Sequence, residues 1–457
     1  MWAGVIAALV AMWLRGRSGA LAAVAALVTG VAVAAPSVAW HVHRLHAGEV
    51  PRLASRHATV AVVVKLVRDP VPTVSSPGSG LLVIDATALR VAHDGWRDLN
   101  APVLLLARGA AWADLLPGQR VQTQARFTPP RRGDDVAAVL DAIGVPTLIG
   151  HPPWWQRAAG RARSSLREAC ASLPDDERGL LPSLVEGDTS KLPASLRDDM
   201  RVTGLSHLEA VSGENLGIVL GVTLAAMRGV GLRRRVRVVA AATAVVGFVV
   251  LARPSPSVQR AAVMSGVMLL AILTGRRTAA RSSLAVAVAA LAVLDPFLAR
   301  SVGFLLSVVA TAGIVVLAPP WTKRLESWMP KPVAIAVAVS AAAQLACMPV
   351  LILTFGQLTP YAIPANLAAG PAVVPATVLG VAAAVIAPIS STAVHPLVWA
   401  GSLPTGLVAW VAHGFARFPG AGATLARPAA IGFAAASMIV LLWAVRRADA
   451  TSRREIL

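Results

Sequence analysis

One short segment of the chain, residues 207–217, combines ionisable, hydroxyl and glycine residues at the start of an apolar run. An ionisable side chain in hydrocarbon costs at least about 2.5 kcal/mol, so such a group is expected to face a cavity, a polar partner or the membrane interface. A glycine beside a serine permits an unwound or closely packed helix, which is tolerated at membrane depth only where protein or water satisfies the backbone. The segment therefore predicts a substrate path, with the candidate residues His207, Glu209, Ser212, Gly213, Glu214, Asn215 and Gly217. The alternative is a helix entrance at the interface with solvated glutamates.

Isolated polar residues interrupt the apolar runs that follow. Side chains of this kind can hydrogen-bond between helices, and such packing is the commoner explanation for any one of them. Taken together, they suggest a hydrated route through the membrane. The further path residues predicted in this way are Arg260, Asp295, Arg300, Gln344 and Asn366.

Few residues are arranged for catalysis or for holding a cofactor. His41, His43 and His46 have a spacing that superficially resembles a metal-binding run, but no downstream carboxylate or histidine cluster completes a set of ligands. The chain also has no glycine-rich phosphate loop followed by Lys and Ser or Thr, so no ATP-driven motor is expected. We therefore predict no enzymatic activity, no metal site and no cofactor.

The elements that must position the path residues are apolar segments long enough to cross a bilayer. Hydrophobic residues make up 56% of the 457 residues and charged residues only 14%. A hydrocarbon core of roughly 30 Å requires helices with apolar runs of about 17 to 25 residues. By this criterion we predict an α-helical polytopic membrane protein with about 11 spans. The spans cover residues 1–14, 18–40, 206–227, 236–252, 258–275, 281–296, 301–318, 332–355, 361–387, 392–416 and 428–446.

The net charge of +19 is unevenly placed along the chain. Residues 41–205 hold 20 Lys and Arg against 17 Asp and Glu, a net charge of +3, which leaves +16 for the membrane region and its short loops. About 17 basic residues fall in the loops and tail on one side of the membrane, as the positive-inside rule requires of the cytoplasmic face. The asymmetry predicts an N-terminus outside, a C-terminus in the cytoplasm and residues 41–205 outside. The basic charge is therefore not itself a sign of nucleic-acid binding.

Residues 48–150 are expected to form a small extracytoplasmic all-β domain. The five predicted strands are rich in β-branched residues and bounded by Pro and Gly turns. They cover residues 58–67, 80–91, 102–107, 120–127 and 145–149. Five short strands predict a small barrel of the OB type. Trp96, Trp112 and Phe127 are its candidate stacking residues for single-stranded nucleic acid. A folded spacer is the alternative.

The segment that follows, residues 151–205, is predicted to be an amphipathic linker at the membrane interface. Trp154 and Trp155 beside Arg157 and Arg161 are typical of a helix lying on a membrane surface. The alternative is that this segment contacts nucleic acid. The other predicted boundaries are two N-terminal transmembrane helices at 1–40, a transmembrane domain at 206–446 and a cytoplasmic tail at 447–457.

The two cysteines are not expected to form a disulfide. Cys170 falls in the predicted external segment, whereas Cys347 falls inside a predicted span. Two cysteines placed in this way provide no disulfide framework. The redox state of the compartment cannot be inferred from them.

The segment 207–217 resembles the signature of the ComEC family, the membrane channels of natural transformation. Further segments extend the resemblance in the same order and spacing over residues 185–370, and the predicted outer barrel is similar to the family's N-terminal OB-like domain. These segments are Gly187–Ser190, Leu196–His207, Pro256–Met264, Asp295–Phe304 and Gln344–Pro349.

The resemblance implies that a competence-type channel domain at 206–446 passes single-stranded DNA from the cell exterior to the cytoplasm across the cell membrane. Implied partners are single-stranded DNA, membrane lipids, a DNA receptor, a separate nuclease and a cytoplasmic helicase or translocase. Many relatives carry a C-terminal metallo-β-lactamase-like domain, but this chain stops at Leu457, so no nuclease is expected in it. The family often has apolar or small residues at positions 209 and 214 and a His at position 215, so the resemblance assigns these positions no individual role.

Two other classes of function stay open. Glu209 and Glu214 fit the path of a polyanion poorly, because every phosphate must keep a counter-charge or water. They favour a secondary transporter for a small solute, in which carboxylates and broken helices bind a cation or proton. The separable outer domain would instead suit a membrane anchor for an assembly partner.

Overall fold

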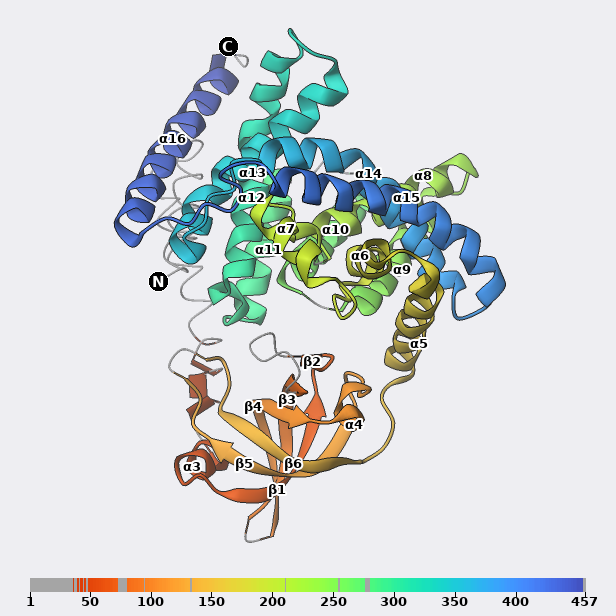
Figure 1. The fold of residues 1–457 in the computed structure, drawn as a ribbon, viewed down its shortest axis with the longest axis vertical. Helices are drawn as coiled ribbons and strands as arrows, with labels where there is room; N and C mark the ends of the chain where they lie inside the picture. Colours follow the sequence, from red (N-terminus) through yellow and green to blue (C-terminus); the bar gives the residue numbers. More distant parts are fainter. Residues whose placement is uncertain are drawn as a thin grey trace. The chain divides into compact units, whose positions relative to one another are not determined.

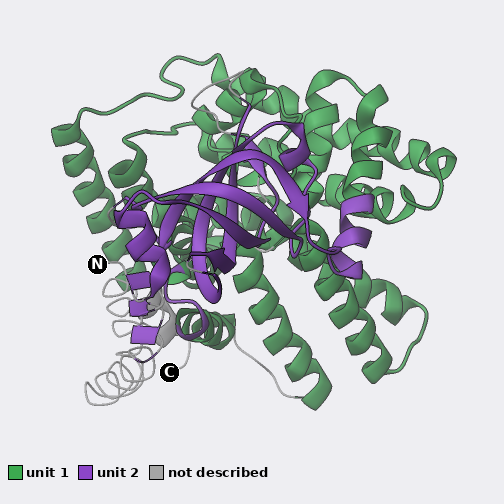
Figure 2. Ribbon diagram, turned by 90° about the horizontal axis from the view of Figure 1, so that it is seen from below, with its two compact units in different colours: residues 1–16, 162–292, 298–457 green, residues 17–161, 293–297 purple. Residues whose placement is uncertain are grey.

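The computed structural model describes residues 36, 39–40, 42–43, 45–46, 48–72, 80–93, 95–131, 134–209, 211–253, 255–275 and 280–454, with side chains to residue 447 (Figure 1). The chain divides into two compact units (Figure 2). Most of unit 1 is residues 162–292 and 298–457, and most of unit 2 is residues 17–161. The predicted span at 1–14 lies outside the described residues, as does all but residues 36, 39 and 40 of the predicted span at 18–40.

Unit 2 is built on a six-stranded sheet with the strand order β1-β5-β6-β4-β3-β2. Pairing of β1 with β3 closes five of the strands into a barrel, in which β4 and β6 run parallel. The predicted small barrel is confirmed, whereas its OB identity stays a prediction. The elements are α3 (Glu49–Ser55), β1 (Thr59–Leu66), β2 (Val71–Pro72), β3 (Leu81–Ala92), β4 (Trp96–Arg108), α4 (Ala110–Ala113), β5 (Arg120–Thr128) and β6 (Ala138–Leu148).

The core of the barrel corrects two of the predicted base-stacking residues. Successive side chains of a strand point to opposite faces, and along β3 every second residue from Leu82 to Ala88 is buried. Trp112 and Phe127 are both 0% exposed and fill this core, so neither can stack on a nucleic-acid base. Trp96 is 42% exposed and keeps an accessible ring, with the Arg90 guanidinium 5.2 Å from the ring centroid.

The rest of the described chain is helical. Apolar runs rich in Ala, Val and Leu form most of the long helices, and glycines with positive φ, Gly275 and Gly356, end α10 and α13. The helices are α5 (Trp154–Ala169), α6 (Asp175–Glu186), α7 (Ala194–Val202), α8 (Gly213–Gly229), α9 (Arg234–Ala252), α10 (Pro256–Thr274), α11 (Ala280–Leu294), α12 (Val302–Leu325), α13 (Lys331–Phe355), α14 (Ala362–Ile386), α15 (Ser391–Ala416) and α16 (Arg427–Arg454), with short 3-10 turns η1 (Cys170–Ser172), η2 (Ser206–Leu208) and η3 (Leu298–Arg300).

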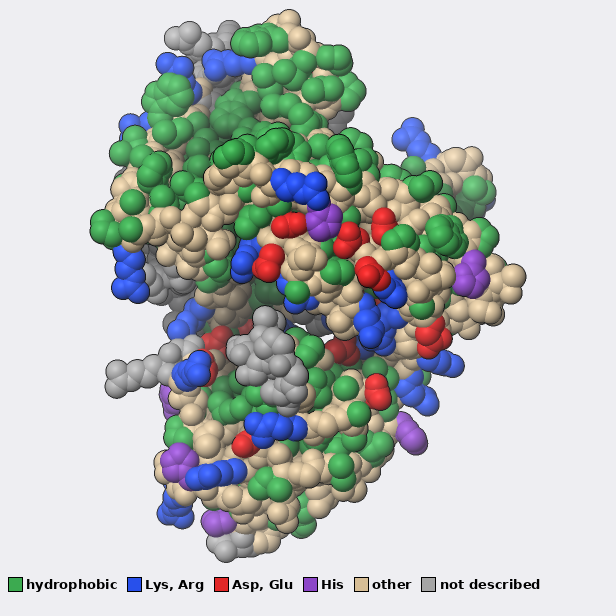
Figure 3. Space-filling model, viewed as in Figure 1, with side chains coloured by type: hydrophobic (Ala, Val, Ile, Leu, Met, Phe, Trp, Pro, Cys, Tyr) green, Lys and Arg blue, Asp and Glu red, His purple; other side chains and the backbone are tan. Residues whose placement is uncertain are grey.

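Six of these helices, α9, α10, α12, α13, α14 and α16, are long and apolar enough to cross a membrane. Apolar side chains cover wide areas of the surface in the helical part of the molecule (Figure 3). The chain is therefore a multi-pass membrane protein. The predicted spans at 206–227, 281–296 and 392–416 also correspond to helices, but α8, α11 and α15 are not among the six, and the larger number of about 11 spans is not confirmed.

Helix α6 lies inside the helical bundle, although its residues belong to the segment predicted as an interfacial linker. Its residues from Gly179 to Glu186 are all buried. Two glycines of the long helices make room for it, because a Cβ on Gly380 of α14 would lie 2.2 Å from Val185 and one on Gly401 of α15 would lie 3.4 Å from Leu181. The small residues of α14 and α15 thus hold α6 in the core.

Helix α5 begins with two exposed tryptophans, and the two cysteines are free. Trp154 and Trp155 are 70% and 45% exposed, as expected of residues at an interface. The membrane contact of this helix stays a prediction. Cys170 and Cys347 are both free, which confirms that they do not pair.

Candidate functional site

The predicted Ser-Gly-Glu-Asn sequence forms the start of α8. Ser212 is the N-cap residue, and its Oγ accepts a hydrogen bond from the Asn215 main-chain N–H at 3.3 Å. Asn215 is 1% exposed, and its Nδ2 donates to the carbonyl oxygen of Leu184 in α6 at 2.7 Å. Ser212 and Asn215 therefore fix the entry of α8 against α6, which is a structural role.

The side chain of Arg260 in α10 also lies at the start of α8. Its guanidinium is buried, with 8% of the residue exposed. Nε donates to Ser307 Oγ of α12 at 2.8 Å, and Nη1 donates to the Met264 sulfur at 3.1 Å. Nη2 points at α8, where a Cβ on Gly213 would lie only 2.9 Å from it. Gly213 thus admits the guanidinium to the start of α8.

The three helices that meet at Arg260, namely α8, α10 and α12, each begin with a serine cap. Ser212, Ser255 and Ser301 precede α8, α10 and α12, and each accepts a hydrogen bond from the main-chain N–H three residues later, at 3.3, 3.4 and 3.1 Å. Ser257 Oγ joins the first two starts by donating to the carbonyl oxygen of Val211 at 3.1 Å. A helix N-terminus carries roughly half a positive charge. We call the three starts together with Arg260 the Arg260 cluster.

Glu209 lies just before this cluster and is held from two sides. Its carbonyl oxygen accepts a hydrogen bond from Ser183 Oγ of α6 at 2.6 Å, and its Oε2 lies 3.9 Å from Arg197 Nε. Its Oε1 is buried without a hydrogen-bond partner. Burial raises the pKa of Glu209 to about 7, although Arg197 and Arg201 act in the opposite direction. Glu209 can therefore exchange a proton near neutral pH.

The other predicted residues of the 207–217 segment lie toward the surface. His207 is exposed, and its Nδ1 lies 3.1 Å from the carbonyl oxygen of Gly204. Glu214 is an exposed residue in the first turn of α8, where a negative charge complements the helix dipole. Gly217 is exposed, and a Cβ there would meet no atom within 4 Å. None of these three residues contributes to the Arg260 cluster in the described structure.

The remaining path candidates are spread over other elements. Gln344 Nε2 of α13 donates to Thr359 Oγ1 at 3.1 Å, and Asn366 Nδ2 donates to the Ala362 carbonyl of its own helix at 2.8 Å. Asp295 Oδ1 accepts from the Phe297 main-chain N–H at 3.1 Å. Arg300 is exposed at the end of η3. Of the predicted set, the structure brings together Ser212, Gly213, Asn215 and Arg260, with Glu209 adjoining.

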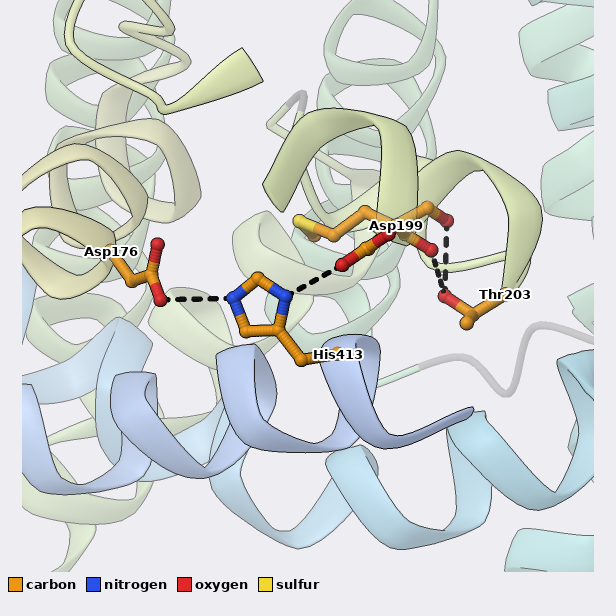
Figure 4. Close-up of polar contacts among 5 residues, drawn as sticks. Asp176, Asp199, Thr203 and His413 are labelled. Atoms are coloured by element: carbon orange, nitrogen blue, oxygen red, sulfur yellow. Dashed lines mark hydrogen bonds and ion pairs between the residues drawn. The ribbon is translucent and has the colours of Figure 1, made fainter. Parts of the chain in front are cut away.

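Two polar side chains of the helical unit are not among the site residues predicted from the sequence. His413 of α15 lies between Asp176 of α6 and Asp199 of α7, so one imidazole links three helices (Figure 4). Glu186 at the end of α6 is 1% exposed, and neither carboxylate oxygen has a hydrogen-bond partner. Burial raises the pKa of Glu186 to about 8, while Arg163 opposes this shift. The surroundings of both side chains are formed by helices whose residues lie far apart in the chain.

Comparison with known proteins connects this arrangement to a family. The family model described as "Competence protein" matches residues 184–449, which is more than half of the chain. The chain belongs to the competence protein family. The matched region contains the Arg260 cluster, Glu209 and the six candidate spans. The resemblance to the ComEC family based on the sequence motifs is thereby confirmed.

The similarity to a protein of Bacillus subtilis supports the same assignment. The chain is 26% identical over 213 residues to the "ComE operon protein 3" of Bacillus subtilis (strain 168). The aligned region covers 46% of this chain but only 27% of that protein, so the chain spans less than a third of its relative's length. No solved structure matches the chain significantly.

Proposed function

We propose that this chain is the route by which a single strand of DNA crosses the cytoplasmic membrane during competence. The observation that carries the proposal is the competence family match over residues 184–449. That region holds the six candidate membrane spans and the residues gathered around the start of α8. The proposal contains no catalytic step for this chain.

The charges of the spans favour a polyanion over a cation as the transported species. A cation- or proton-coupled permease binds its coupling ion with carboxylates near the middle of its helices. The six candidate spans contain no Asp or Glu, and the ionisable residue buried at the start of α10 is an arginine. Glu209 and Glu214 lie before and in the first turn of α8, outside those six helices.

The orientation and partners form the second part of the proposal. The basic loops favour an extracytoplasmic barrel, an N-terminus outside and a cytoplasmic C-terminus. In this orientation the strand enters from the side of the barrel. A DNA receptor and a separate nuclease would deliver it there, and a cytoplasmic helicase or translocase would draw it in.

A gene deletion tests the proposal in the bacterium that carries this chain. We expect labelled duplex DNA still to bind the surface of the deletion strain, while no label becomes resistant to added nuclease or reaches the cytoplasm. Expression of the chain from a plasmid should restore entry. Entry at the wild-type rate without the gene would overturn the proposal.

A further inference from the structure

The guanidinium of Arg260 is a buried positive charge that no described carboxylate balances. Its hydrogen-bond partners are a neutral hydroxyl, Ser307 Oγ, and a neutral thioether, Met264 Sδ. None of the ion pairs in the described part of the chain includes Arg260, and Glu214 in the first turn of α8 is exposed. A buried charge is normally paired, because desolvation costs several kcal/mol per ion. A negatively charged ligand would therefore be favoured beside this guanidinium.

We propose that the Arg260 cluster binds a phosphodiester group of the single strand as the strand passes. The site would take the phosphate and not the base, so it would act without sequence preference. This inference rests on the proposed function and assigns one binding site within it.

The start of α8, which lies beside Arg260 Nη2, offers main-chain donors to a phosphate. The first N–H groups of a helix have no partner within the helix, and each capping serine satisfies only one of them. The starts of α8 and α10 are joined through Ser257, and a Cβ on Gly303 of α12 would lie 4.0 Å from Pro256 of α10. Helix N-termini of this kind bind phosphate through backbone N–H groups and the helix dipole. Here the guanidinium lies against the start of α8 at Gly213 and against the second turn of α12 at Ser307.

The chemistry of the side chains favours an anion with diffuse charge. A guanidinium binds phosphate oxygens in a planar, two-pronged geometry. Ser307 and Met264 are weak partners for a full positive charge, so a phosphate can replace them without breaking an ion pair. The absence of a side chain at Gly213 lets Nη2 lie against the start of α8.

A structural role for Arg260 makes a different prediction about stability. Replacing a buried ion pair with apolar side chains of similar volume is often neutral or stabilising, and an unpaired buried charge is costlier than a pair. We therefore expect Arg260→Met to raise or preserve the melting temperature of the full chain in detergent while it impairs DNA binding. A structural arginine would show the reverse, a lower melting temperature with unchanged binding per folded molecule.

The decisive measurement is the salt dependence of DNA binding. The full chain in nanodiscs of zwitterionic lipid is titrated with a fluorescent oligothymidylate between 50 and 300 mM salt, concentrations at which each phosphate contact on a single strand contributes roughly 0.7 to the slope of log K against log salt. We expect Arg260→Gln to lower the slope by about that amount and the affinity by roughly tenfold at low salt. Arg260→Lys should keep the slope. Arg281→Gln, which removes an exposed arginine of α11, is the matched control and should change neither quantity.

A second variant keeps the charge and blocks the approach. The added Cβ of Gly213→Ala would lie 2.9 Å from Arg260 Nη2 and 3.1 Å from the Ala261 Cβ, so the guanidinium must move. We expect weaker binding with this variant even though the buried charge is retained. Ser307→Ala, which removes one of the two hydrogen-bond partners of Arg260 and leaves Met264, should bind at least as well as the wild type.

The outcomes separate the site from the function. Wild-type protein that neither binds nor passes the oligonucleotide would contradict the proposed function. Wild-type binding together with an unchanged slope in Arg260→Gln and unchanged affinity in Gly213→Ala would overturn the site alone. A difference between wild type and Arg260→Gln that appears only with anionic lipid would assign the site to a lipid phosphate and also overturn the inference. If millimolar inorganic phosphate displaced the oligonucleotide from the wild type but not from Arg260→Gln, this result would support the site.

Discussion

His413 Nδ1 lies 2.6 Å from Oδ2 of Asp199, while Nε2 of the same ring lies 3.0 Å from Oδ2 of Asp176 (Figure 4). Asp199 is fixed in turn at its backbone, because Thr203 Oγ1 donates to its carbonyl oxygen at 2.7 Å. An imidazole that meets a carboxylate at each nitrogen is best satisfied when it is protonated and donates twice. The two contacts of His413 therefore tie α15 to α6 and α7 most strongly when the imidazole is charged and both contacts are ion pairs.

The first prediction concerns the pH dependence that His413 imposes on stability. Burial lowers the pKa of His413, but the hydrogen bonds to Asp199 and Asp176 outweigh burial and raise the pKa above its ordinary value. The folded state thus binds the proton more tightly, so the contribution is complete below the unfolded pKa of about 6.5 and is lost as pH rises through the folded pKa. We expect His413→Gln to lower the unfolding free energy by roughly 1 to 3 kcal/mol at pH 6 and by less at pH 9. Chemical unfolding in detergent measures both.

The control for this prediction lies on the same helix. His395 of α15 is exposed, so His395→Gln should leave the unfolding free energy unchanged at both pH values. An equal loss of stability in His413→Gln at pH 6 and pH 9 would contradict the ion-pair interpretation and leave only a packing role.

The second prediction concerns Glu186, whose carboxylate is buried without a hydrogen bond. Burial raises its pKa to about 8. The folded state therefore binds this proton more tightly than the unfolded state, and stability falls as pH rises from the unfolded pKa of about 4.3 to the folded pKa. Glu186→Gln mimics the protonated form. We expect it to match the wild type near pH 5 and to be more stable than the wild type at pH 9.

Thermal unfolding of the full chain at several pH values checks this expectation. Glu168→Gln removes an exposed carboxylate from α5, so its melting temperature should follow that of the wild type throughout. A Glu186→Gln variant that is less stable than the wild type at pH 9 would show that the ionised carboxylate is stabilised by the nearby arginines.

The third prediction concerns the contact of α6 with α14. A methyl group on Gly380 would lie 2.2 Å from Val185 Cγ2 and 3.2 Å from a Leu181 methyl, so α6 must shift. Overpacking of this kind costs about 1 to 3 kcal/mol. We expect Gly380→Ala to lower the melting temperature.

A second glycine of α14 provides the matched control. A methyl group on Gly370 would meet no atom within 4 Å, and alanine is favoured over glycine in a helix by about 1 kcal/mol. Gly370→Ala should therefore leave the melting temperature unchanged or raise it. If both variants lost stability equally, the tight packing of Gly380 would not be the cause.

The sequence predicted the apolar helices well because each carries its own signal. A run such as residues 236–252 identifies a helix by length and composition alone, and the structure has α9 at Arg234–Ala252. Helix α6 lacks such a signal. Its first turn holds Asp175, Asp176 and Glu177, so it resembles a surface segment, and only the glycines of α14 and α15 explain why its second half is buried.

The candidate site likewise has a part that could be predicted from local sequence and a part that could not. The Ser212–Asn215 sequence predicted a special helix start, since a capping residue is a local property. Its meeting with Arg260 rests on contacts between α8 and α10 and could not be deduced from spacing. Gln344 and Asn366 were assigned to the same path because they interrupt apolar runs, yet their hydrogen bonds go to Thr359 and Ala362. A polar residue within a span can therefore make a local hydrogen bond without lying on a path.

The last prediction separates a structural from a transport role at the start of α8. Asn215 is buried and donates to the Leu184 carbonyl, so Asn215→Ala leaves that acceptor without its donor at a cost of about 1 to 3 kcal/mol. The neighbouring Glu214 is exposed, and its removal should cost only the dipole contribution of about 0.3 to 1 kcal/mol.

We therefore expect Asn215→Ala to lower the melting temperature and the amount of folded protein, while DNA passage per folded molecule stays near the wild-type value. Glu214→Gln should leave stability and passage almost unchanged, and proteoliposomes containing it should show no altered proton flux. Proteoliposome uptake of a labelled single strand, normalised to folded protein, measures the first expectation. Loss of passage in fully folded Asn215→Ala would place Asn215 on the path itself. A changed proton flux in Glu214→Gln would instead favour the permease, because only a coupling carboxylate would carry that signal.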